Sequence, residues 1–372
     1  MDVKNFVEVI NCDFYTGVPD SQLKALCNYL INTYGMNNNN HHIIAANEGN
    51  AAAIAAGYNL ATGQFAAVYM QNSGLGNIVN PSASLLNPKV YNIPAIFIIG
   101  WRGEPGVHDE PQHIYQGRIT LKLLDDLGIK FFVLNQDTSQ QELYNVMKDF
   151  RVELNNNNCV AFVVRKDALT YDEKVLYNND YIMTREEIIR HIIKFSGDSP
   201  IISTTGKTSR ELFELRDTHE RDFLTVGSMG HASSIALGAA LNQPGKKFFC
   251  IDGDGAALMH LGSLAVIGSL APKNLVHIVI NNSAHESVGG LPTVASKINL
   301  PGIAKSCGYV NIFSVNDYDS LDQALKIARE SDELAFIEAK SQIKSRENLG
   351  RPTTSALDNK LEFMKFLARQ SS

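Results

Sequence analysis

The sequence predicts an α/β protein with two doubly wound parallel sheets, each in a domain of its own. The first observation is that short apolar runs alternate with longer helical patterns, which places helices on both faces of a parallel sheet. The second is that this alternation occurs in two blocks, separated by a polar segment. The third is that glycine-rich and polar motifs directly follow the apolar runs, where α/β proteins bind their ligands.

The apolar runs have the length and composition of buried strands, and the patterns between them have helical length. In the first block, strands are predicted at 43–47, 65–70, 94–99, 129–134 and 159–164, with helices at 48–61 and 139–154. In the second block, strands are predicted at 200–204, 223–226, 247–252, 275–280 and 335–339, with helices at 184–196, 208–218, 230–242, 256–270 and 320–331.

A chain of 372 residues is long enough for two domains of ordinary size. We expect a first domain at 1–167, a polar, tyrosine-rich linker at 168–183 and a second domain at 184–345. The tail at 346–372 contains an apolar stretch, 357–367, that predicts a docking helix.

Composition excludes several classes of function. The net charge of −6 argues against non-specific binding to nucleic acid, so an anionic substrate needs a local basic cluster. Five scattered cysteines without C-x-x-C spacing indicate reduced thiols and a cytoplasmic protein. We expect no signal peptide and no membrane partner, because the N-terminus lacks an apolar core and no apolar run reaches spanning length.

The most informative motif lies in the second block. Gly253-Asp254-Gly255 ends one apolar strand, and Asn281-Asn282 ends the next strand after 25 intervening residues. Because neighbouring parallel strands end at the same edge of the sheet, a carboxylate and an amide oxygen converge there, which suits Mg²⁺. The glycines allow close backbone approach, and the helix that begins near Ala256 aims free N–H groups at an anion. The pattern therefore predicts a Mg²⁺–diphosphate site.

This pattern resembles the thiamine-diphosphate motif of the pyruvate-decarboxylase-like enzymes. The resemblance implies that Asp254, Asn282 and the backbone carbonyl of Ala284 bind the metal. Gly253, Gly255 and Ala256 would then contact the cofactor.

The first block carries a second match to this family. Asn47 and Glu48 open a helix whose face is almost entirely Gly and Ala. Read from the residues alone, Glu48 is an acid favourably placed at the start of a helix. The resemblance implies a catalytic role instead: the carboxyl of Glu48 hydrogen-bonds N1′ of the aminopyrimidine and activates the cofactor.

Further matches lie in the segments 226–232 and 204–209. The resemblance implies that the carbonyl of Gly227 accepts a hydrogen bond from the cofactor and that Met229 wedges it into a bent form; Met229 as an ordinary core residue is the alternative. Three residues in the second segment are expected to hold the diphosphate, namely Gly206, Thr208 and Ser209. A nucleotide-hydrolase P-loop is excluded, because Ile201 occupies the position that requires glycine.

The chain has no room for the third domain of the larger family members, so it resembles the compact branch of phosphonopyruvate and sulfopyruvate decarboxylases. The resemblance implies decarboxylation of the small anionic 2-oxo acid 3-phosphonopyruvate in phosphonate biosynthesis, by a homo-oligomer with active sites between subunits. The loop 100–113 offers Arg102, His108 and His113 as phosphonate ligands, and His108 or His113 as proton donor; each can also be an ordinary loop residue. Sulfopyruvate as substrate and a non-catalytic thiamine-diphosphate-binding regulator stay open as alternatives.

Overall fold

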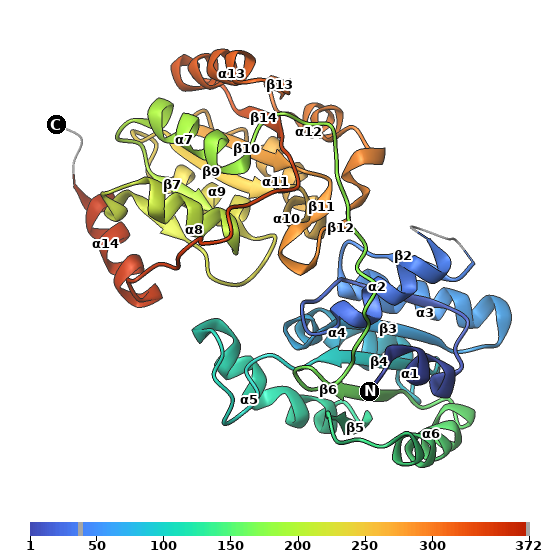
Figure 1. Ribbon diagram of the computed structural model, residues 1–372. Helices are drawn as coiled ribbons and strands as arrows, with labels where there is room; N and C mark the ends of the chain where they lie inside the picture. The colour runs from blue at the N-terminus through green and yellow to red at the C-terminus, as the bar shows by residue number, and fades with distance from the viewer. Residues whose placement is uncertain (36–39, 370–372) are drawn as a thin grey trace. The chain divides into compact units, whose positions relative to one another are not determined.

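The computed structural model describes residues 1–35 and 40–369. The chain divides into two compact units, Met1–Leu176 and Tyr177–Ser372. The division lies within a stretch without regular structure between β6 and α7, inside the segment 168–183 (Figure 1). Each unit is described by itself below.

The first unit contains a parallel six-stranded sheet of order β2-β1-β3-β4-β6-β5. Its strands are β1 (Tyr15–Gly17), β2 (His42–Ile44), β3 (Ala66–Gln71), β4 (Ala95–Gly100), β5 (Lys130–Leu134) and β6 (Val160–Val164). Its helices are α1 (Val3–Ile10), α2 (Lys24–Tyr34), α3 (Glu48–Thr62), η1 (Asn72–Gly74), α4 (Leu75–Pro81), η2 (Ser82–Leu86), α5 (Pro111–Asp126) and α6 (Gln140–Asn155).

The second unit contains a parallel six-stranded sheet of order β13-β14-β10-β9-β7-β8 and a small hairpin of β11 and β12. Its strands are β7 (Ile201–Ser203), β8 (Asp222–Leu224), β9 (Phe248–Gly253), β10 (Leu275–Asn281), β11 (Ala284–His285), β12 (Leu291–Pro292), β13 (Asn311–Val315) and β14 (Ala335–Lys340). Its helices are α7 (Arg185–Ser196), α8 (Lys207–Leu215), η3 (His219–Arg221), α9 (Ala232–Asn242), α10 (Asp254–Met259), α11 (Gly262–Leu270), η4 (Glu286–Val288), η5 (Val294–Lys297), α12 (Leu300–Cys307), α13 (Tyr318–Glu330) and α14 (Ala356–Ala368).

The two large sheets have the same topology. If the strands of the second sheet are numbered along the chain as β7, β8, β9, β10, β13 and β14, both orders read 2-1-3-4-6-5. Helices lie on both faces of each sheet (Figure 1). The central strands β4, β6 and β10 are therefore buried at every position, as expected for parallel strands rich in Val, Ile and Phe. The predicted α/β fold is confirmed.

The C-terminal helix α14 covers the edge strand β8 of the second sheet. Asn359 of α14 is buried, accepts a hydrogen bond from the N–H of Leu224 (3.0 Å) and donates one to the carbonyl of Asp222 (2.7 Å). The outer side of an edge strand has backbone N–H and C=O groups without a partner strand. The Asn359 side chain provides hydrogen-bond partners for two of these groups in β8.

The predicted elements differ from the structure in a few places. The helix predicted at 256–270 is two helices, α10 and α11, separated at His260 and Leu261. The prediction omitted strands β1 and β13, because β1 has three residues and the edge strand β13 contains polar residues that dilute its apolar pattern. Among the described residues, no helix combines the length and apolarity needed to cross a bilayer.

Candidate active site

Glu48 is the first residue of α3, and residues 45–47 connect it to the end of β2. Asn47 caps the helix by accepting a hydrogen bond from the N–H of Gly49 at 2.8 Å, which starts the helix at Glu48. The side chain of Glu48 is 5% exposed, and its Oε2 accepts a hydrogen bond from Nδ2 of Asn77 at 2.7 Å. Burial raises the pKa of Glu48, and the bond from Asn77 opposes this only in part. The fold therefore favours the protonated carboxyl.

The absence of a side chain at Gly74 makes room for this carboxyl. A Cβ atom at Gly74 would lie 2.5 Å from Cγ and 2.6 Å from Oε1 of Glu48. Neither Asn77 nor Gly74 was predicted from the sequence, because Asn77 reaches Glu48 through the packing of α3 on α4 and Gly74 lies against Glu48 just before α4. Their contacts hold the Glu48 side chain in one place.

A second buried carboxyl in the first unit, Asp20, was also missed. It follows β1, is fully buried, and accepts hydrogen bonds from Nε2 of Gln71 (2.6 Å) and the N–H of Gln22 (2.9 Å). Burial raises its pKa. Asp20, Gln71 and Glu48 all lie at or just beyond the carboxyl ends of the neighbouring strands β1, β3 and β2, which α/β proteins use for ligand binding.

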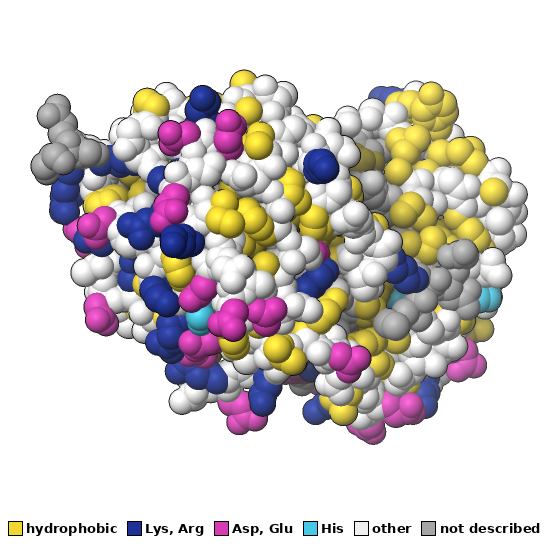
Figure 2. All heavy atoms as spheres, turned by 90° about the horizontal axis from the view of Figure 1, so that it is seen from above, with side chains coloured by type: hydrophobic (Ala, Val, Ile, Leu, Met, Phe, Trp, Pro, Cys, Tyr) yellow, Lys and Arg dark blue, Asp and Glu magenta, His cyan; other side chains and the backbone are white. Residues whose placement is uncertain are grey.

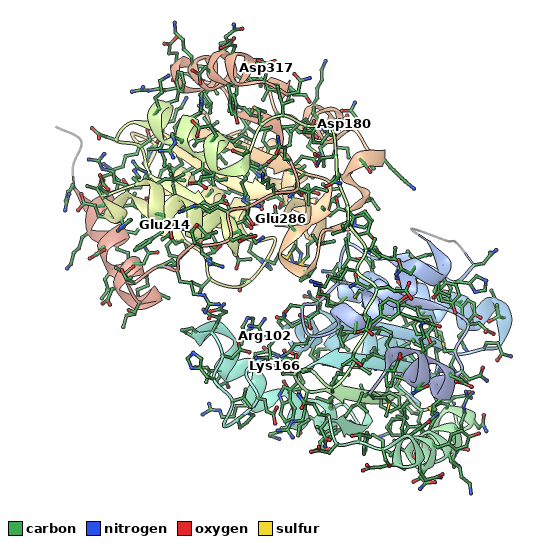
Figure 3. The ribbon with its side chains drawn as sticks, in the orientation of Figure 1. Arg102, Lys166, Asp180, Glu214, Glu286 and Asp317 are labelled. Carbon is green, nitrogen blue, oxygen red and sulfur yellow. The ribbon has the colours of Figure 1, made fainter. Side chains whose placement is uncertain are left out.

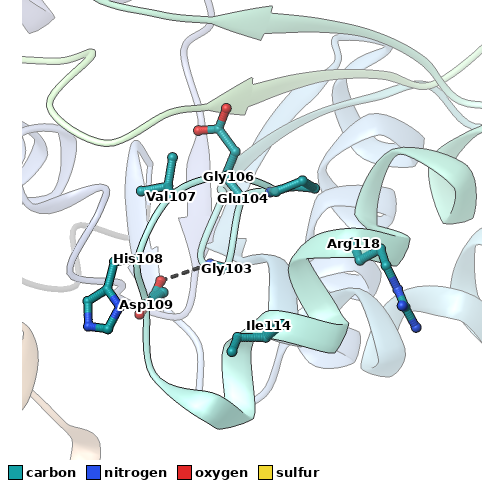
Figure 4. A pocket seen from close by; sticks show the side chains of 9 residues that line it. Gly103, Glu104, Gly106, Val107, His108, Asp109, Ile114 and Arg118 are labelled. Carbon is teal, nitrogen blue, oxygen red and sulfur yellow. Dashed lines mark hydrogen bonds between the residues drawn. The ribbon is translucent and has the colours of Figure 1, made fainter.

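The loop between β4 and α5 surrounds a hollow of about 470 Å³ lined by residues 103–109, Ile114 and Arg118 (Figure 4). The predicted ligand His108 is exposed and lines this hollow. His113 is half-buried outside the lining, and burial lowers its pKa, which favours a neutral ring at neutral pH.

Arg102, predicted to bind the phosphonate, is engaged by an acid of the same loop. Its Nε and Nη2 donate to Oδ2 and Oδ1 of Asp109 at 2.8 and 2.5 Å, and Nη1 donates to Ser21 at 3.2 Å. Asp109 also accepts the N–H of Gly103 at 2.8 Å (Figure 4). The guanidinium thus orders the loop, and an incoming anion would compete with Asp109 for it.

In the second unit, the Gly253–Gly255 turn joins β9 to α10 as predicted. Gly253 pairs with Ile280 of the adjacent strand β10, so Asp254 and Asn282 follow neighbouring strand ends. Asp254 is 3% exposed, and its Oδ2 accepts a hydrogen bond from Oγ1 of Thr293 at 2.5 Å. Burial raises the pKa of Asp254 to about 7; Thr293 and the backbone N–H groups of Asp254, Gly255 and Asn282 lower it in part.

Asn282 and Ala284 lie where β10 turns into the β11–β12 hairpin. The Oδ1 atom of Asn282 accepts the N–H of Ala284 at 3.0 Å, and its Nδ2 donates to Oε2 of Glu286 at 3.1 Å. Ala284 begins β11 and pairs with Pro292, so the hairpin returns Thr293 to the turn that holds Asp254. Thr293 and Glu286 were not predicted, because only the folding of this hairpin brings them to Asp254 and Asn282.

The segment Gly227–Gly230 packs against the same turn. A Cβ atom at Gly255 would lie 3.5 Å from Cε of Met229 and 3.1 Å from two ring atoms of His285. At Gly230, whose φ is +86°, a Cβ would lie 2.9 Å from the carbonyl oxygen of Ala256. Met229 is half-buried, so part of this apolar side chain stays open beside the Gly-Asp-Gly turn.

The predicted diphosphate residues Gly206, Thr208 and Ser209 lie at the start of α8. Gly206 is the residue before the helix, with a φ of +86° that favours glycine, and Thr208 is buried. The Ser209 hydroxyl lies 2.8 Å from that of Ser203 and donates to the carbonyls of Thr204 and Thr225. Ser209 thus links neighbouring strand ends through hydrogen bonds, and its contact with the diphosphate stays a prediction.

The residues of the second unit fit a Mg²⁺–diphosphate group. Asp254 is a buried carboxyl whose hydrogen-bond donors are neutral, so a divalent cation would compensate for its burial. Among the described residues there is no group of three His, Cys, Asp or Glu side chains that could hold a metal. Mg²⁺ is commonly bound by one or two carboxylates together with phosphate oxygens of a ligand. One carboxylate with an amide and a carbonyl oxygen fits this kind of site.

On the face seen in Figure 2, acidic and basic side chains of the described residues are interspersed, without a broad basic patch. This mixed distribution agrees with the small negative net charge.

Comparisons with known proteins match both units. The N-terminal TPP binding domain of the thiamine pyrophosphate enzymes matches residues 5–129, and the C-terminal TPP binding domain matches residues 204–339. The phosphonopyruvate decarboxylase of Streptomyces viridochromogenes is 35% identical over 94% of this chain and 90% of its own length. That of Streptomyces hygroscopicus is 36% identical over 94% and 89%, and the sulfopyruvate decarboxylase of Methanosarcina acetivorans is 28% identical over 81% and 82%. The chain therefore belongs to the thiamine pyrophosphate enzymes, in the family of the phosphonopyruvate decarboxylases.

Proposed function

We propose that this protein is a thiamine-diphosphate- and Mg²⁺-dependent decarboxylase that converts 3-phosphonopyruvate to phosphonoacetaldehyde and CO₂ in phosphonate biosynthesis. The observation that carries the cofactor assignment is the convergence of Asp254, Asn282 and the start of α10 at adjacent strand ends. The substrate follows from the similarity to two phosphonopyruvate decarboxylases over 94% of the chain.

In this proposal the second unit binds the charged end of the cofactor. Asp254, Asn282 and the carbonyl of Ala284 would hold Mg²⁺, and the first N–H groups of α10 and α8 would face the diphosphate. Met229 would contact the cofactor beside Gly255.

The first unit provides the group that holds a proton. Because burial raises the pKa of Glu48, its carboxyl can donate a hydrogen bond from Oε1 to a ring nitrogen while Oε2 accepts from Asn77. When bound, the cofactor supplies the electron sink for the pair released as CO₂ leaves. His108, at the exposed rim of the hollow, is the candidate in this loop for contact with the phosphonate.

The test is simultaneous detection of CO₂ and aldehyde from phosphonopyruvate, with and without thiamine diphosphate and Mg²⁺. Turnover that requires both additions supports the proposal. Sulfopyruvate in the same assay tests the second candidate, which the 28% identical sulfopyruvate decarboxylase supports less strongly than the longer match at 35–36% supports phosphonopyruvate. Cofactor binding without turnover of either acid would indicate a non-catalytic regulator. The buried Glu48 carboxyl argues against a regulator, because a protein that only binds the cofactor does not need an activating carboxyl.

We also propose that the active protein is a homo-oligomer in which Glu48 of one copy and Asp254 of another serve the same cofactor. Mixed oligomers of Glu48→Gln and Asp254→Ala test this. In a two-fold symmetric dimer, random mixing of the two inactive variants restores about one quarter of the wild-type activity, because half the dimers are mixed and each has one intact site. A mixture that stays inactive after subunit exchange would refute the shared site.

A further inference from the structure

Glu286 lies in the second unit (Figure 3), where two cationic side chains and one amide donate hydrogen bonds to its largely buried carboxylate. Its Oε2 accepts hydrogen bonds from Nη1 of Arg185 at 2.6 Å and from Nδ2 of Asn282 at 3.1 Å. Its Oε1 accepts a hydrogen bond from Nζ of Lys207 at 2.9 Å. One carboxylate thus joins α7, the start of α8 and the strand end that carries Asn282.

Arg185 is itself held from the other side. Its Nε and Nη2 donate to the two oxygens of Glu211, each at 2.7 Å, which is a bidentate pair. Arg185 is 7% exposed and Glu211 is 1% exposed, so the pair has little freedom to move. The Arg185–Glu211 pair therefore fixes the position of the Glu286 carboxylate, and it does so without involving Asn282.

Asn282 has two chemically different ends, and its surroundings select one orientation. The nitrogen end faces the Glu286 carboxylate, which can only accept, and the oxygen end faces the N–H of Ala284, which can only donate. A reversed amide would place an oxygen against a carboxylate and an NH₂ group against an N–H, so both contacts would become repulsive. Only the present orientation leaves amide-oxygen lone pairs for a cation.

We propose that Glu286 is a positioning residue that holds the amide of Asn282 with its oxygen, and not its nitrogen, available to the divalent cation beside Asp254. This inference rests on the proposed metal-dependent function of the same site. It concerns the affinity for the metal, whatever 2-oxo acid the enzyme uses. Residues that orient metal ligands typically contribute roughly 10- to 100-fold to metal affinity.

The neighbouring residue provides a matched control. Nδ2 of Asn281 donates to Oε1 of Glu338 at 2.7 Å, and Glu338 is 3% exposed. Glu338 also binds Lys340 and Ser314, so it is a buried carboxylate with a cation and an asparagine amide as partners, as Glu286 is. Asn281 is not among the proposed metal ligands. Glu286→Gln and Glu338→Gln therefore make the same chemical change beside two consecutive asparagines.

The experiment measures Mg²⁺ affinity by calorimetry at a fixed, saturating concentration of thiamine diphosphate. We expect Glu286→Gln to weaken Mg²⁺ binding roughly 10- to 100-fold, because glutamine presents either end to Asn282 and no longer selects its orientation. Glu338→Gln should stay within about threefold of the wild type. Excess Mg²⁺ should restore cofactor binding in Glu286→Gln, which a merely loosened fold would not show.

Wild-type Mg²⁺ affinity in a folded Glu286→Gln protein would overturn the inference, and so would equal weakening in both variants. If Glu286→Gln does not fold, Glu286→Asp keeps the charge that Arg185 and Lys207 require but withdraws it from Asn282 by one methylene. Weakened Mg²⁺ binding in Glu286→Asp supports the inference and unchanged binding overturns it. A wild-type protein that binds Mg²⁺ and cofactor but turns over no 2-oxo acid would refute the proposed function without touching this result.

Discussion

Replacing Glu48 by glutamine separates its chemical task from its structural one. The change keeps the shape of the side chain, and the carbonyl oxygen of the glutamine can still accept the 2.7 Å hydrogen bond from Asn77. What it removes is the acidic proton that the buried carboxyl can donate. We expect turnover to fall by about 10²- to 10⁴-fold, the usual contribution of a positioned acid or base, while most of the cofactor affinity is kept.

The stability of the variant provides an independent check on the electrostatics. Because the pKa of Glu48 is raised above its ordinary value of 4.5, the folded protein holds the proton at pH values where the unfolded chain has released it. Glu48 therefore destabilises the wild type progressively as the pH rises above about 4.5. A glutamine at this position does not titrate and carries no such cost, so we expect Glu48→Gln to become more stable relative to the wild type as the pH rises above about 4.5.

The assays are steady-state decarboxylation, calorimetric binding of thiamine diphosphate, and urea unfolding at several pH values. Glu142→Gln is the matched control, because Glu142 also lies in the first turn of a helix, α6, but is exposed. Its activity and pH profile should equal those of the wild type. Retained turnover in Glu48→Gln would show that the reaction does not need Glu48. If Glu48→Gln instead became less stable relative to the wild type as the pH rises, the argument from burial would be refuted.

Three further changes test other parts of the site. Asp254→Ala should abolish Mg²⁺-dependent cofactor binding, and unaltered calorimetric affinity would contradict the metal assignment. Gly74→Ala should lower turnover at least tenfold, because its Cβ would lie 2.5 Å from Cγ of Glu48, whereas Gly76→Ala adds a methyl group to open space and should be active. Burial lowers the pKa of His42 from 6.5 to about 4, so the first unit should lose roughly 3 kcal/mol of stability as the pH falls through that window. Urea unfolding followed by Trp101 fluorescence should show this loss of stability in the wild type but not in His42→Gln. Equal losses in the two proteins would refute the prediction for His42.

The sequence was sufficient to predict the fold and the local motifs, because each depends on a continuous stretch of chain. At Asp254, strand β9 is followed directly by helix α10, and Glu48 follows a short apolar run and Asn47. The supporting contacts could not be predicted in the same way. Asn77 reaches Glu48 across 29 positions and Thr293 reaches Asp254 across 39, so only the folded chain reveals them.

Arg102 shows a different limit of sequence reasoning. The loop 100–113 contains one arginine and several acids, and its composition alone does not say which groups pair. In the structure Asp109 takes both Nε and Nη2 of Arg102, seven positions away. The arginine predicted as a phosphonate ligand is also an ordered part of the loop, which only the pairing geometry reveals; its contact with the phosphonate stays a prediction.

The identical strand order of the two sheets makes the difference in their chemistry instructive. A carboxyl that must keep its proton and a carboxylate that must hold a cation place opposite demands on the same kind of group. A divalent cation lowers the pKa of any nearby carboxyl, so a site that binds Mg²⁺ strongly is a poor place to store a proton. In this chain Glu48 follows the second strand of one sheet, with the neutral amide of Asn77 as its partner, and Asp254 follows the third strand of the other. The equivalent third strand of the first unit ends in the neutral residues Gln71 and Asn72, and Gln71 donates a hydrogen bond to the buried carboxyl of Asp20, whose pKa burial raises. Under the proposed function, one fold used twice would supply a carboxyl that keeps its proton at Glu48 and a carboxylate that holds a cation at Asp254, because the residues at its strand ends differ.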